Sequence, residues 1–451
     1  MISTPKVGSF TFNKFFTAKI NGGTILLFAA LLAIVLANSP WSGAFLGFWQ
    51  NDFVIAIGDI HLFSYQGRPM TLLEFINDAL MAIFFFSIGL EIKREVLVGE
   101  LCSLKQAMFP IVAAIGGMVF PVLFFVLLSP AGEPSQGMAI PMATDIAFSL
   151  GVLALFGKRV PLSLKIFLTT LAVADDIGGI IVIAGFYSNH ISVDFLLISM
   201  LVLSLIYIGG LRYKIQSKMF YVVFGFIFWT LFLESGIHPS IAGVLVALAI
   251  PARPKYKVSV YLATIKESVD CFPRRKIEEK MKIILNHEQI DRLKVIESAS
   301  DKVISPLQHF EDNLHPIINY AVMPIFALAN AGVIINASEL SGIIYGLPLA
   351  IIVGLVAGKF VGIFSFAYFF DKMGWINKSS DVNWKQIAAV SVVAGIGFTV
   401  SLFIANLAYG FDSPYLNQSK LGVVTGSLIA GLLGYFLLNK YLPKLDSKSS
   451  K

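Results

Sequence analysis

Two adjacent carboxylates stand in the middle of an apolar run. Asp175 and Asp176 lie within residues 166–187, with nine residues of the run before them and eleven after. Neighbouring residues of a helix point about 100° apart, so the two side chains face different partners yet remain close enough to influence each other. Burial and a neighbouring like charge both disfavour the ionised form of a carboxylate. Such a pair can hold either a proton or a metal cation and release one when it takes the other.

A buried acid pair can also serve helix packing alone, as part of a salt bridge. An ionisable side chain at the centre of a bilayer costs at least ~2.5–3.5 kcal/mol on insertion scales, so such residues are usually functional. Two carboxylates in tandem are harder to attribute to packing than one. Five charged residues of this kind interrupt the apolar runs: Asp78, Asp145, Asp175, Asp176 and Lys359.

Lys359 is the only charged residue in the apolar run 342–370. A lysine near the end of a span can extend its ammonium group to the membrane surface. Lys359 lies too far from either end of its run for that explanation to fit well. We therefore expect it to be the counter-ion of one member of the acid pair.

A second polar pair, Thr144 and Asp145, follows Pro141 in the run 138–156. Proline removes a backbone donor and disturbs a helix. A broken helix at membrane depth is tolerated only where it is buried in protein or lines a cavity. The sequence therefore predicts an interrupted helix at this polar pair.

The run 386–409 has a matching weak point at Gly395-Ile396-Gly397. Taken alone, this motif more often marks close helix packing than a break. Where broken helices meet, their N-termini carry partial positive charge and their C-termini partial negative charge. Asp145 is suited to offset facing N-termini, and Lys359 to offset facing C-termini.

Membrane-spanning helices are the elements expected to position these residues. Of the 451 residues, 56% are hydrophobic and 14% charged, and the mean hydropathy is +0.78, whereas soluble chains carry about 25% charged residues. Apolar runs of this length indicate transmembrane helices, and no soluble core would bury a dozen of them. The sequence predicts an all-α polytopic membrane protein with about twelve transmembrane helices. They lie near residues 22–38, 71–90, 107–128, 138–156, 166–187, 193–211, 219–235, 239–251, 316–335, 342–370, 386–409 and 421–439.

The basic residues follow the positive-inside rule. If the N-terminus is cytoplasmic and the spans alternate, 31 of the 34 lysines and arginines fall in cytoplasmic segments, and only Arg68 and Lys420 fall in outer loops. Both termini are therefore predicted to be cytoplasmic. The net charge of +6 reflects this topology rather than nucleic-acid binding. The two cysteines, Cys102 and Cys271, offer neither a disulfide framework nor metal-ligand spacing.

The spans form two comparable sets. Spans 3–5 and spans 10–12 enter the membrane from opposite sides, and each set has its interruption in the middle span, number 4 or 11. This is typical of inverted-topology repeats. Residues 1–451 are predicted to form one integral membrane transporter domain, in which 20–251 hold spans 1–8, 252–314 form a long cytoplasmic loop, and 315–440 hold spans 9–12.

Two of the loops have structural signals of their own. In residues 50–65, the short stretches 54–57 (VIAI) and 61–63 (HLF) flank Gly58-Asp59, and this pattern predicts a small extracytoplasmic β-hairpin. The loop 252–314 has charges at helical spacing around residues 274–302, which favours a helical excursion over a solvated linker only slightly.

Several stretches of the sequence resemble the NhaA-type family of sodium/proton antiporters. The resemblance covers about residues 20–440. The matching stretches are 77–82 (NDALMA), 89–95 (GLEIKRE), 143–148 (ATDIAF), 174–178 (ADDIG), 236–238 (GIH), 326–332 (FALANAG), 358–359 (GK) and 395–399 (GIGFT).

The resemblance implies a secondary transporter and not an enzyme. It implies electrogenic exchange of cytoplasmic Na⁺ or Li⁺ for external protons, contributing to pH and sodium homeostasis. It also implies a multi-pass protein of the cell inner membrane that forms a homodimer, with no cofactor besides the transported ions and no nucleic-acid partner.

The resemblance also assigns roles to single residues. Asp176 is the expected main sodium ligand, and Asp175 its partner, paired with Lys359 when sodium is absent. Thr144 is expected at the same site, and Asp145 between the helix ends. Asp78 is expected along the cytoplasmic-side approach, and a pH response is expected from Glu91, Glu95, His238 and Glu311.

The sequence departs from the family in the pH-response region. The loop 252–314 is much longer than the family's usual connection, and Asp312 follows Glu311 where a histidine is expected. A lone histidine such as His238 is also compatible with an ordinary hydrogen-bonded role. Both departures lie in the region expected to control the pH response, and neither lies in the stretches expected to carry the transport reaction.

Two other classes of membrane protein are alternatives to an antiporter. An intramembrane aspartyl protease places its two acids on separate helices, one of them in Gly-x-Gly-Asp, and that tetrapeptide does not occur in this sequence. A passive cation channel uses rings of carbonyls or charges from repeated subunits. A single acid pair with an opposing lysine fits alternating access better.

Overall fold

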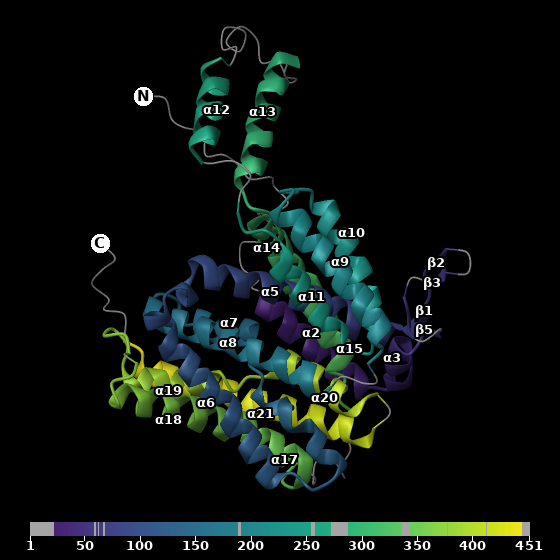
Figure 1. Cartoon of the computed structure of the whole chain (residues 1–451). Coiled ribbons are helices and arrows are strands. Elements are labelled where there is room, and N and C mark those ends of the chain that lie inside the picture. Colours follow the sequence, from purple (N-terminus) through teal and green to yellow (C-terminus); the bar gives the residue numbers. More distant parts are fainter. Residues whose placement is uncertain are drawn as a thin grey trace. The chain divides into compact units, whose positions relative to one another are not determined.

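The computed structural model is built almost entirely of helices, with a few short strands within residues 52–71 (Figure 1). It describes residues 22–57, 60–61, 63–65, 68–187, 191–253, 258–271, 287–335, 343–376, 378–411 and 413–443. Within these residues six helical segments are long and apolar enough to cross a membrane, or nine if each bent pair of helices is one span. The predicted class, a polytopic helical membrane protein, is thereby confirmed, whereas the number of twelve spans stays a prediction.

A helix or a series of consecutive helices occupies each predicted span. The first half contains α2 (Gly22–Ala37), α3 (Ser42–Trp49), α4 (Leu72–Phe75), η1 (Ile76–Leu80), α5 (Met81–Val98), η2 (Glu100–Cys102), α6 (Leu104–Leu128), η3 (Glu133–Met142), α7 (Ile146–Ala154), η4 (Gly157–Arg159), α8 (Leu162–Phe186), α9 (Val193–Leu211), α10 (Lys218–Glu234) and α11 (Pro239–Ala249). The second half contains α12 (Val258–Asp270), α13 (His287–Val303), α14 (Pro306–Ile317), η5 (Ile318–Val322), α15 (Met323–Asn330), α17 (Gly346–Val353), η6 (Gly354–Gly358), α18 (Lys359–Lys372), α19 (Trp384–Val393), α20 (Phe398–Tyr409) and α21 (Pro414–Tyr441).

The described residues divide into two compact units. The larger comprises those within Met1–Phe84, Glu95–Asn189 and Pro316–Lys451, and the smaller those within Phe85–Arg94 and His190–His315. The larger unit contains every residue that the sequence places at the acid pair. A single domain over residues 1–451 stays a prediction.

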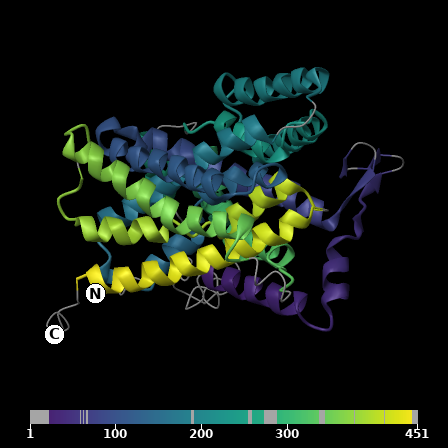
Figure 2. The ribbon, with the colours of Figure 1, turned by 90° about the horizontal axis from the view of Figure 1, so that it is seen from below.

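Close helix packing in the larger unit depends on glycines. A Cβ atom added at Gly116 of α6 would lie 2.2 Å from the backbone oxygen of Gly362 of α18, and one added at Gly362 would lie 2.1 Å from the oxygen of Gly116. Small residues let helix backbones approach closely where lipid provides no hydrophobic drive. This crossing fixes α18 against α6 one turn after Lys359. On another side of the unit, the long helix α21 lies beside α17 and α19 (Figure 2).

The two predicted interruptions are both present. The helices η3 and α7 bend by 40° at their break, and α19 and α20 bend by 46°. In the first pair, Pro141 lies in the last turn of a 3-10 helix, and Asp145 is the N-cap of α7. In the second pair, a Cβ at Gly395 would lie 2.3 Å from the backbone oxygen of Leu355. The Gly-Ile-Gly motif therefore serves both the break and close packing.

Two features near the N-terminus were not predicted. Pro40 follows α2, and the chain turns there by 120° into the short helix α3, since the residue before a proline avoids helical conformation. The second is a three-stranded sheet with the strand order β1 (Asp52–Phe53), β5 (Arg68–Thr71), β4 (Ser64–Tyr65).

The predicted hairpin is present in part. The strands β2 (Ala56–Ile57) and β3 (Ile60–His61) pair antiparallel, with Ala56 opposite His61 and Ile57 opposite Ile60. The expected turn at Gly58-Asp59 lies outside the described residues. The side of the membrane on which this hairpin lies stays a prediction.

The assignment of Lys420 to an outer loop is wrong. Lys420 lies within α21 and is only 8% exposed. The helix starts early because Ser413 caps it by accepting a hydrogen bond from the Tyr415 backbone N–H, and Pro414 occupies its first turn. The correction leaves Arg68 as the single basic residue assigned to an outer loop, so the charge asymmetry becomes sharper.

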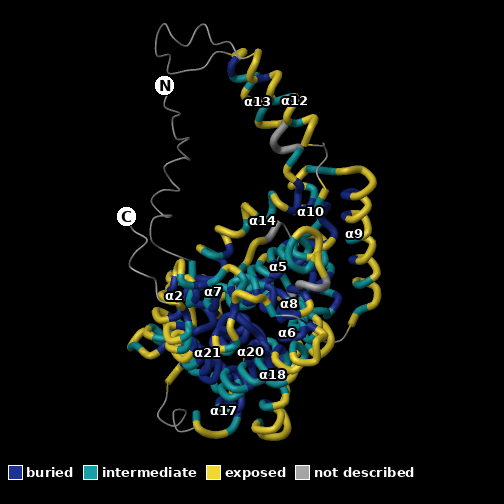
Figure 3. Tube along the Cα trace, turned by 90° about the vertical axis from the view of Figure 1, so that its left-hand side faces the viewer, coloured by how far each residue is buried: buried dark blue, intermediate teal, exposed yellow. Residues whose placement is uncertain are grey.

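In the smaller unit, the predicted excursion is helical. The helices α12 and α13 lie side by side, with α14 following them in the chain (Figure 1). Residues 254–257 and 272–286 of the loop lie outside the described part, and its cytoplasmic location stays a prediction. Burial differs strongly between elements: α9 is largely exposed, whereas α20 of the larger unit is buried along nearly its whole length (Figure 3).

Candidate functional site

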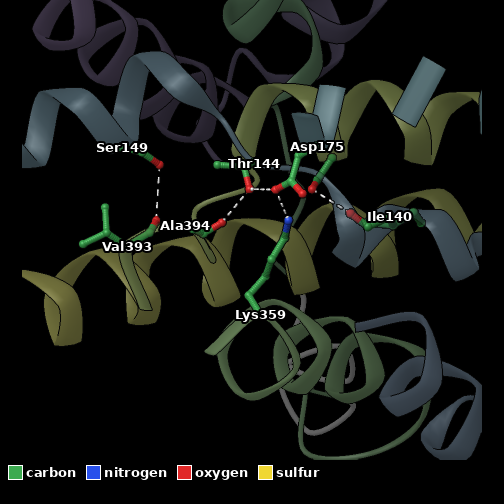
Figure 4. A network of polar contacts seen from close by, with 8 residues as sticks. Ile140, Thr144, Ser149, Asp175, Lys359, Val393 and Ala394 are labelled. Atoms are coloured by element: carbon green, nitrogen blue, oxygen red, sulfur yellow. Dashed lines mark hydrogen bonds and ion pairs between the residues drawn. The ribbon is translucent and has the colours of Figure 1, made fainter. Parts of the chain in front are cut away.

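A buried ion pair lies at the middle of α8. The Nζ atom of Lys359 is 2.5 Å from Oδ2 of Asp175, and both side chains are fully buried. The hydroxyl oxygen of Thr144 lies 2.8 Å from the same carboxylate oxygen and 2.8 Å from the carbonyl oxygen of Ala394 (Figure 4). The expected pairing of Lys359 with Asp175 is thus present, and Thr144 adjoins it from the break of the first interrupted helix pair.

A local helical irregularity precedes the lysine. The turn η6 is π-helical and ends at Gly358, directly before Lys359. A π-turn inserts an extra residue into a helix and is frequent at functional sites. Because Gly362 presses α18 onto α6 one turn later, the Lys359 side chain is held in the interior rather than at a membrane surface.

Asp175 has one oxygen left over. Its Oδ1 atom is buried and has no hydrogen-bond partner among the residues that the structure describes. A Cβ added at Gly117 of α6 would lie 3.8 Å from this oxygen, so the absent side chain keeps the approach to it uncrowded. A buried carboxylate oxygen without a partner is unfavourable, and it is therefore available to a proton or a cation. Asp176, the next residue of α8, is also buried, at 6% exposed.

Asp145 joins the N-termini of two half-helices. As the N-cap of α7 its Oδ1 accepts a hydrogen bond from the Phe148 N–H at 3.1 Å. Its Oδ2 accepts from the Thr399 backbone N–H, in the first turn of α20, at 3.1 Å, and from the Thr399 hydroxyl. A carboxylate at a helix N-terminus offsets the partial positive charge there. Asp145 therefore occupies the position that its charge predicted.

Two hydroxyl groups lie at backbone carbonyl groups of the C-terminus of α19. The Ser149 hydroxyl donates to the Val393 carbonyl at 3.2 Å, and Thr144 lies at the Ala394 carbonyl (Figure 4). Within the described residues Lys359 bonds to Asp175 and not to these carbonyl groups. Its expected action on the C-termini would therefore be through charge at a distance.

Replacing Asp145 by alanine is expected to destabilise the protein by about 3–5 kcal/mol, because three donors at two helix N-termini lose their acceptor in a buried place. The midpoint of thermal unfolding in detergent measures this loss. The matched control is Asp194→Ala, since Asp194 is an exposed acid in the first turn of α9, where the helix-terminus effect is only about 0.3–1 kcal/mol. Equal shifts in the two variants would contradict the double-capping role.

The remaining predicted residues lie on other elements. In the larger unit, Asp78 lies in the π-helical turn η1, and Glu95 accepts from the Glu100 N–H at 3.1 Å. In the smaller unit, Glu91 lies in α5, and His238 is the N-cap of α11, accepting from the Ser240 N–H at 3.3 Å.

An ion pair within the smaller unit involves a further predicted residue. Glu311 forms a salt bridge of 3.0 Å with Arg94. Arg94 lies in a matching stretch, but no role was predicted for it. Its position three residues after Glu91, in the same charged helix end, could have indicated one.

Several polar residues of the larger unit were not predicted from the sequence. Thr399 and Ser149 complete the contacts at the helix breaks, although Thr399 lies in a matching stretch. Asn406 donates hydrogen bonds to Asn77 and Asn330, and all three asparagines are buried. Uncharged residues in apolar runs give little sequence signal, because only ionisable groups stand out there.

Comparison with known proteins gives consistent matches over the whole chain. The family model described as Na⁺/H⁺ antiporter 1 matches residues 13–438. A protein of Phocaeicola vulgatus named Na(+)/H(+) antiporter NhaA is 51% identical over 438 residues, which cover 97% of each chain. One of Bacteroides fragilis with the same name is 50% identical over 432 residues, 95% of this chain and 98% of the relative. A protein of Syntrophotalea carbinolica, Na(+)/H(+) antiporter NhaA 2, is 42% identical over 437 residues, 95% and 96% of the two chains.

Proposed function

Because this chain belongs to the Na⁺/H⁺ antiporter 1 family, we propose that its exchange of sodium ions for protons takes place at the acid pair of α8. The chain is a multi-pass membrane protein and a sodium/proton antiporter. The observation that carries the site is the divided environment of Asp175. One of its oxygens is bonded by Lys359 and Thr144, while the other is buried without a partner.

The ion pair supports a competition mechanism. In the sodium-free form the Lys359 ammonium neutralises Asp175. A sodium ion arriving between Asp175 and Asp176 supplies the same positive charge, with Asp176 as the main ligand, and the Lys359 contact is released. Protons return to the site when sodium leaves. Since a site of this kind binds a proton or sodium but not both, the two fluxes are coupled in opposite directions.

The proposal extends to the surrounding helices. We infer twelve transmembrane spans in one domain, with spans 3–5 and 10–12 as inverted repeats, which the paired breaks near Asp145 and Gly395 support. Half-helices that meet beside a substrate ion are typical of such repeats. Asp78 would line the cytoplasmic-side approach. The pH response would involve Glu91, Glu95, His238 and Glu311.

The cellular setting follows from the same family. The protein would lie in the cell inner membrane with both termini in the cytoplasm, exchange cytoplasmic Na⁺ or Li⁺ for external protons electrogenically, and act as a homodimer. It would need no cofactor and would be a transporter rather than an enzyme.

A pH-resolved transport assay tests this function. In everted vesicles energised to an acidic lumen, addition of Na⁺ or Li⁺ is expected to release protons from the lumen, whereas K⁺ has little effect. A fluorescent pH indicator reports the lumen, and vesicles without the protein are the control. Sodium flux that leaves the pH of the lumen unchanged would instead indicate a passive channel.

A further inference from the structure

Three buried asparagines form a second polar cluster in the larger unit. Asn77 lies in η1, Asn330 at the end of α15 and Asn406 in α20, and their exposed fractions are 4%, 0% and 5%. The Nδ2 group of Asn406 donates to Oδ1 of Asn330 at 2.6 Å and to Oδ1 of Asn77 at 3.2 Å. One amide thus joins three separate helical segments.

The bonding capacity of the cluster is not used up. The Nδ2 groups of Asn77 and Asn330 donate to backbone carbonyls one turn back in their own helices, at 2.9 and 3.0 Å. Both side chains are therefore held in place as acceptors. The Oδ1 atom of Asn406 is buried and has no hydrogen-bond partner within the described part of the chain. Since buried polar groups are normally all paired, this amide is only partly satisfied in the conformation described.

The cluster joins two groups of helices. Helix α20 belongs with the site, because Thr399 in its first turn bonds to Asp145 and its helix packs on η3 and α21. Helix α15 packs chiefly on α2, and contacts η1 and α20 to an equal, smaller extent. Asn406 therefore ties the helices of the ion site to the α2–α15–η1 group.

Alternating access moves one bundle of helices against another around the bound ion. Contacts beyond about 3.5 Å are no longer hydrogen bonds, so a relative shift of about 1 Å or more would break both the 2.6 Å and the 3.2 Å bond of Asn406. We propose that Asn406 is a positioning residue whose amide holds α20 against Asn330 and Asn77 in the conformation described here. The bonds must then break once in every exchange cycle. This inference rests on the proposed alternating exchange at Asp175 and Asp176.

The simpler explanation is static packing, in which polar side chains join helices permanently. We call the contact of Asn406 with Asn330 and Asn77, if it opens in each cycle, a latch. The unpaired Oδ1 of Asn406 favours a latch over static packing, because a permanent contact would be expected to satisfy the whole amide. The two explanations differ in one measurable respect: a latch must open for transport, whereas a static contact must not.

A reversible cross-link tests this difference. Asn330→Cys and Asn406→Cys are combined in a protein that also carries Cys102→Ser and Cys271→Ser, which remove the two free exposed cysteines. Two side chains that meet through a hydrogen bond between their amide groups place their Cβ atoms farther apart than a direct disulfide allows, so the two thiols are joined by a short bifunctional methanethiosulfonate reagent. This cross-link is expected to reduce sodium-dependent proton movement at least tenfold, and its reduction to restore the movement. Antiport that continues at the same rate in the fully cross-linked protein would overturn the latch.

A cross-link inside one helix group is the matched control. A Cβ at Gly422 of α21 would lie 3.2 Å from the Cβ of Ile351 of α17, so thiols at these two positions are within reach of the same reagent. Cross-linking an Ile351→Cys, Gly422→Cys pair in this way is expected to leave antiport within twofold of its reduced rate. The reduced proteins report on the proposed function separately, because they exchange sodium for protons whether or not the latch exists.

If the cysteine pair does not fold, Asn406→Leu provides the second test. A latch predicts that the apparent KM for sodium changes at least threefold per folded molecule, because the balance between two conformations shifts. Static packing predicts less folded protein with the same KM, and that result would also overturn the proposal.

Discussion

Replacing Asp176 by asparagine is expected to abolish sodium-dependent proton movement in everted vesicles, while the protein still inserts into the membrane. Asparagine keeps the size of the side chain but neither carries a negative charge nor takes up a proton. Loss of one buried charged ligand removes about 3 kcal/mol from the free energy of sodium binding. The rate of sodium-dependent proton movement should therefore fall by roughly two orders of magnitude. The measurement is the change in lumen pH on addition of Na⁺, normalised to the amount of inserted protein.

The neighbouring acid gives a graded comparison. Asp175→Asn is expected to impair exchange, since Asp175 supplies the unpaired oxygen and the contact with Lys359. Asp194→Asn, at an exposed helix end, should transport normally. If Asp176→Asn exchanged sodium for protons at the normal rate, the assignment of the ion site to this pair would be wrong.

The second large effect concerns the stability of the buried ion pair. Replacing Lys359 by methionine, which has a similar shape, leaves Asp175 buried without its counter-charge. Breaking one side of such a pair costs about 3–5 kcal/mol. Lys359→Met is therefore expected to lower the midpoint of thermal unfolding in detergent, and to weaken transport. Lys359→Ala should act in the same direction, with a cavity added.

Removing both charges separates charge from packing. The double variant Asp175→Asn with Lys359→Met has no uncompensated charge, so most of the lost stability is expected to return, although transport should not. A buried ion pair is often no more stable than a neutral pair of similar volume. If the two substitutions instead lowered the unfolding midpoint additively, the two side chains would not be acting as a pair.

Charge placement made the buried ion pair predictable. A lone lysine and a tandem acid pair in apolar runs point to each other, because neither is tolerated in a membrane without compensation. The same logic placed Asp145 at facing helix N-termini, where it bonds to Phe148 and Thr399. Proline and the Gly-Ile-Gly motif located the helix breaks, since both have direct effects on the backbone.

Other features were out of reach of the sequence. Lys420 was assigned to a loop because hydropathy falls there, although a capped helix had already begun at Pro414. The short helix α3 and the sheet formed by β1, β5 and β4 have too few residues for a periodic signal. The asparagine cluster joins residues 329 positions apart in the chain, and uncharged amides do not stand out in composition.

By itself, the sequence determined that this chain is a helical membrane protein with a buried acid pair, a counter-charge and two broken helices. These follow from the cost of moving charges and unpaired backbone groups into an apolar medium, which acts on every residue locally. The family resemblance implied that Lys359 pairs with Asp175, and the structure confirms this pair. The tertiary structure alone decided that one carboxylate oxygen of Asp175 has no hydrogen-bond partner among the described residues, and that Asn406 joins two groups of helices. Such choices depend on which backbones approach one another, as at Gly116 and Gly362, and contact between distant segments is fixed only when the helices pack.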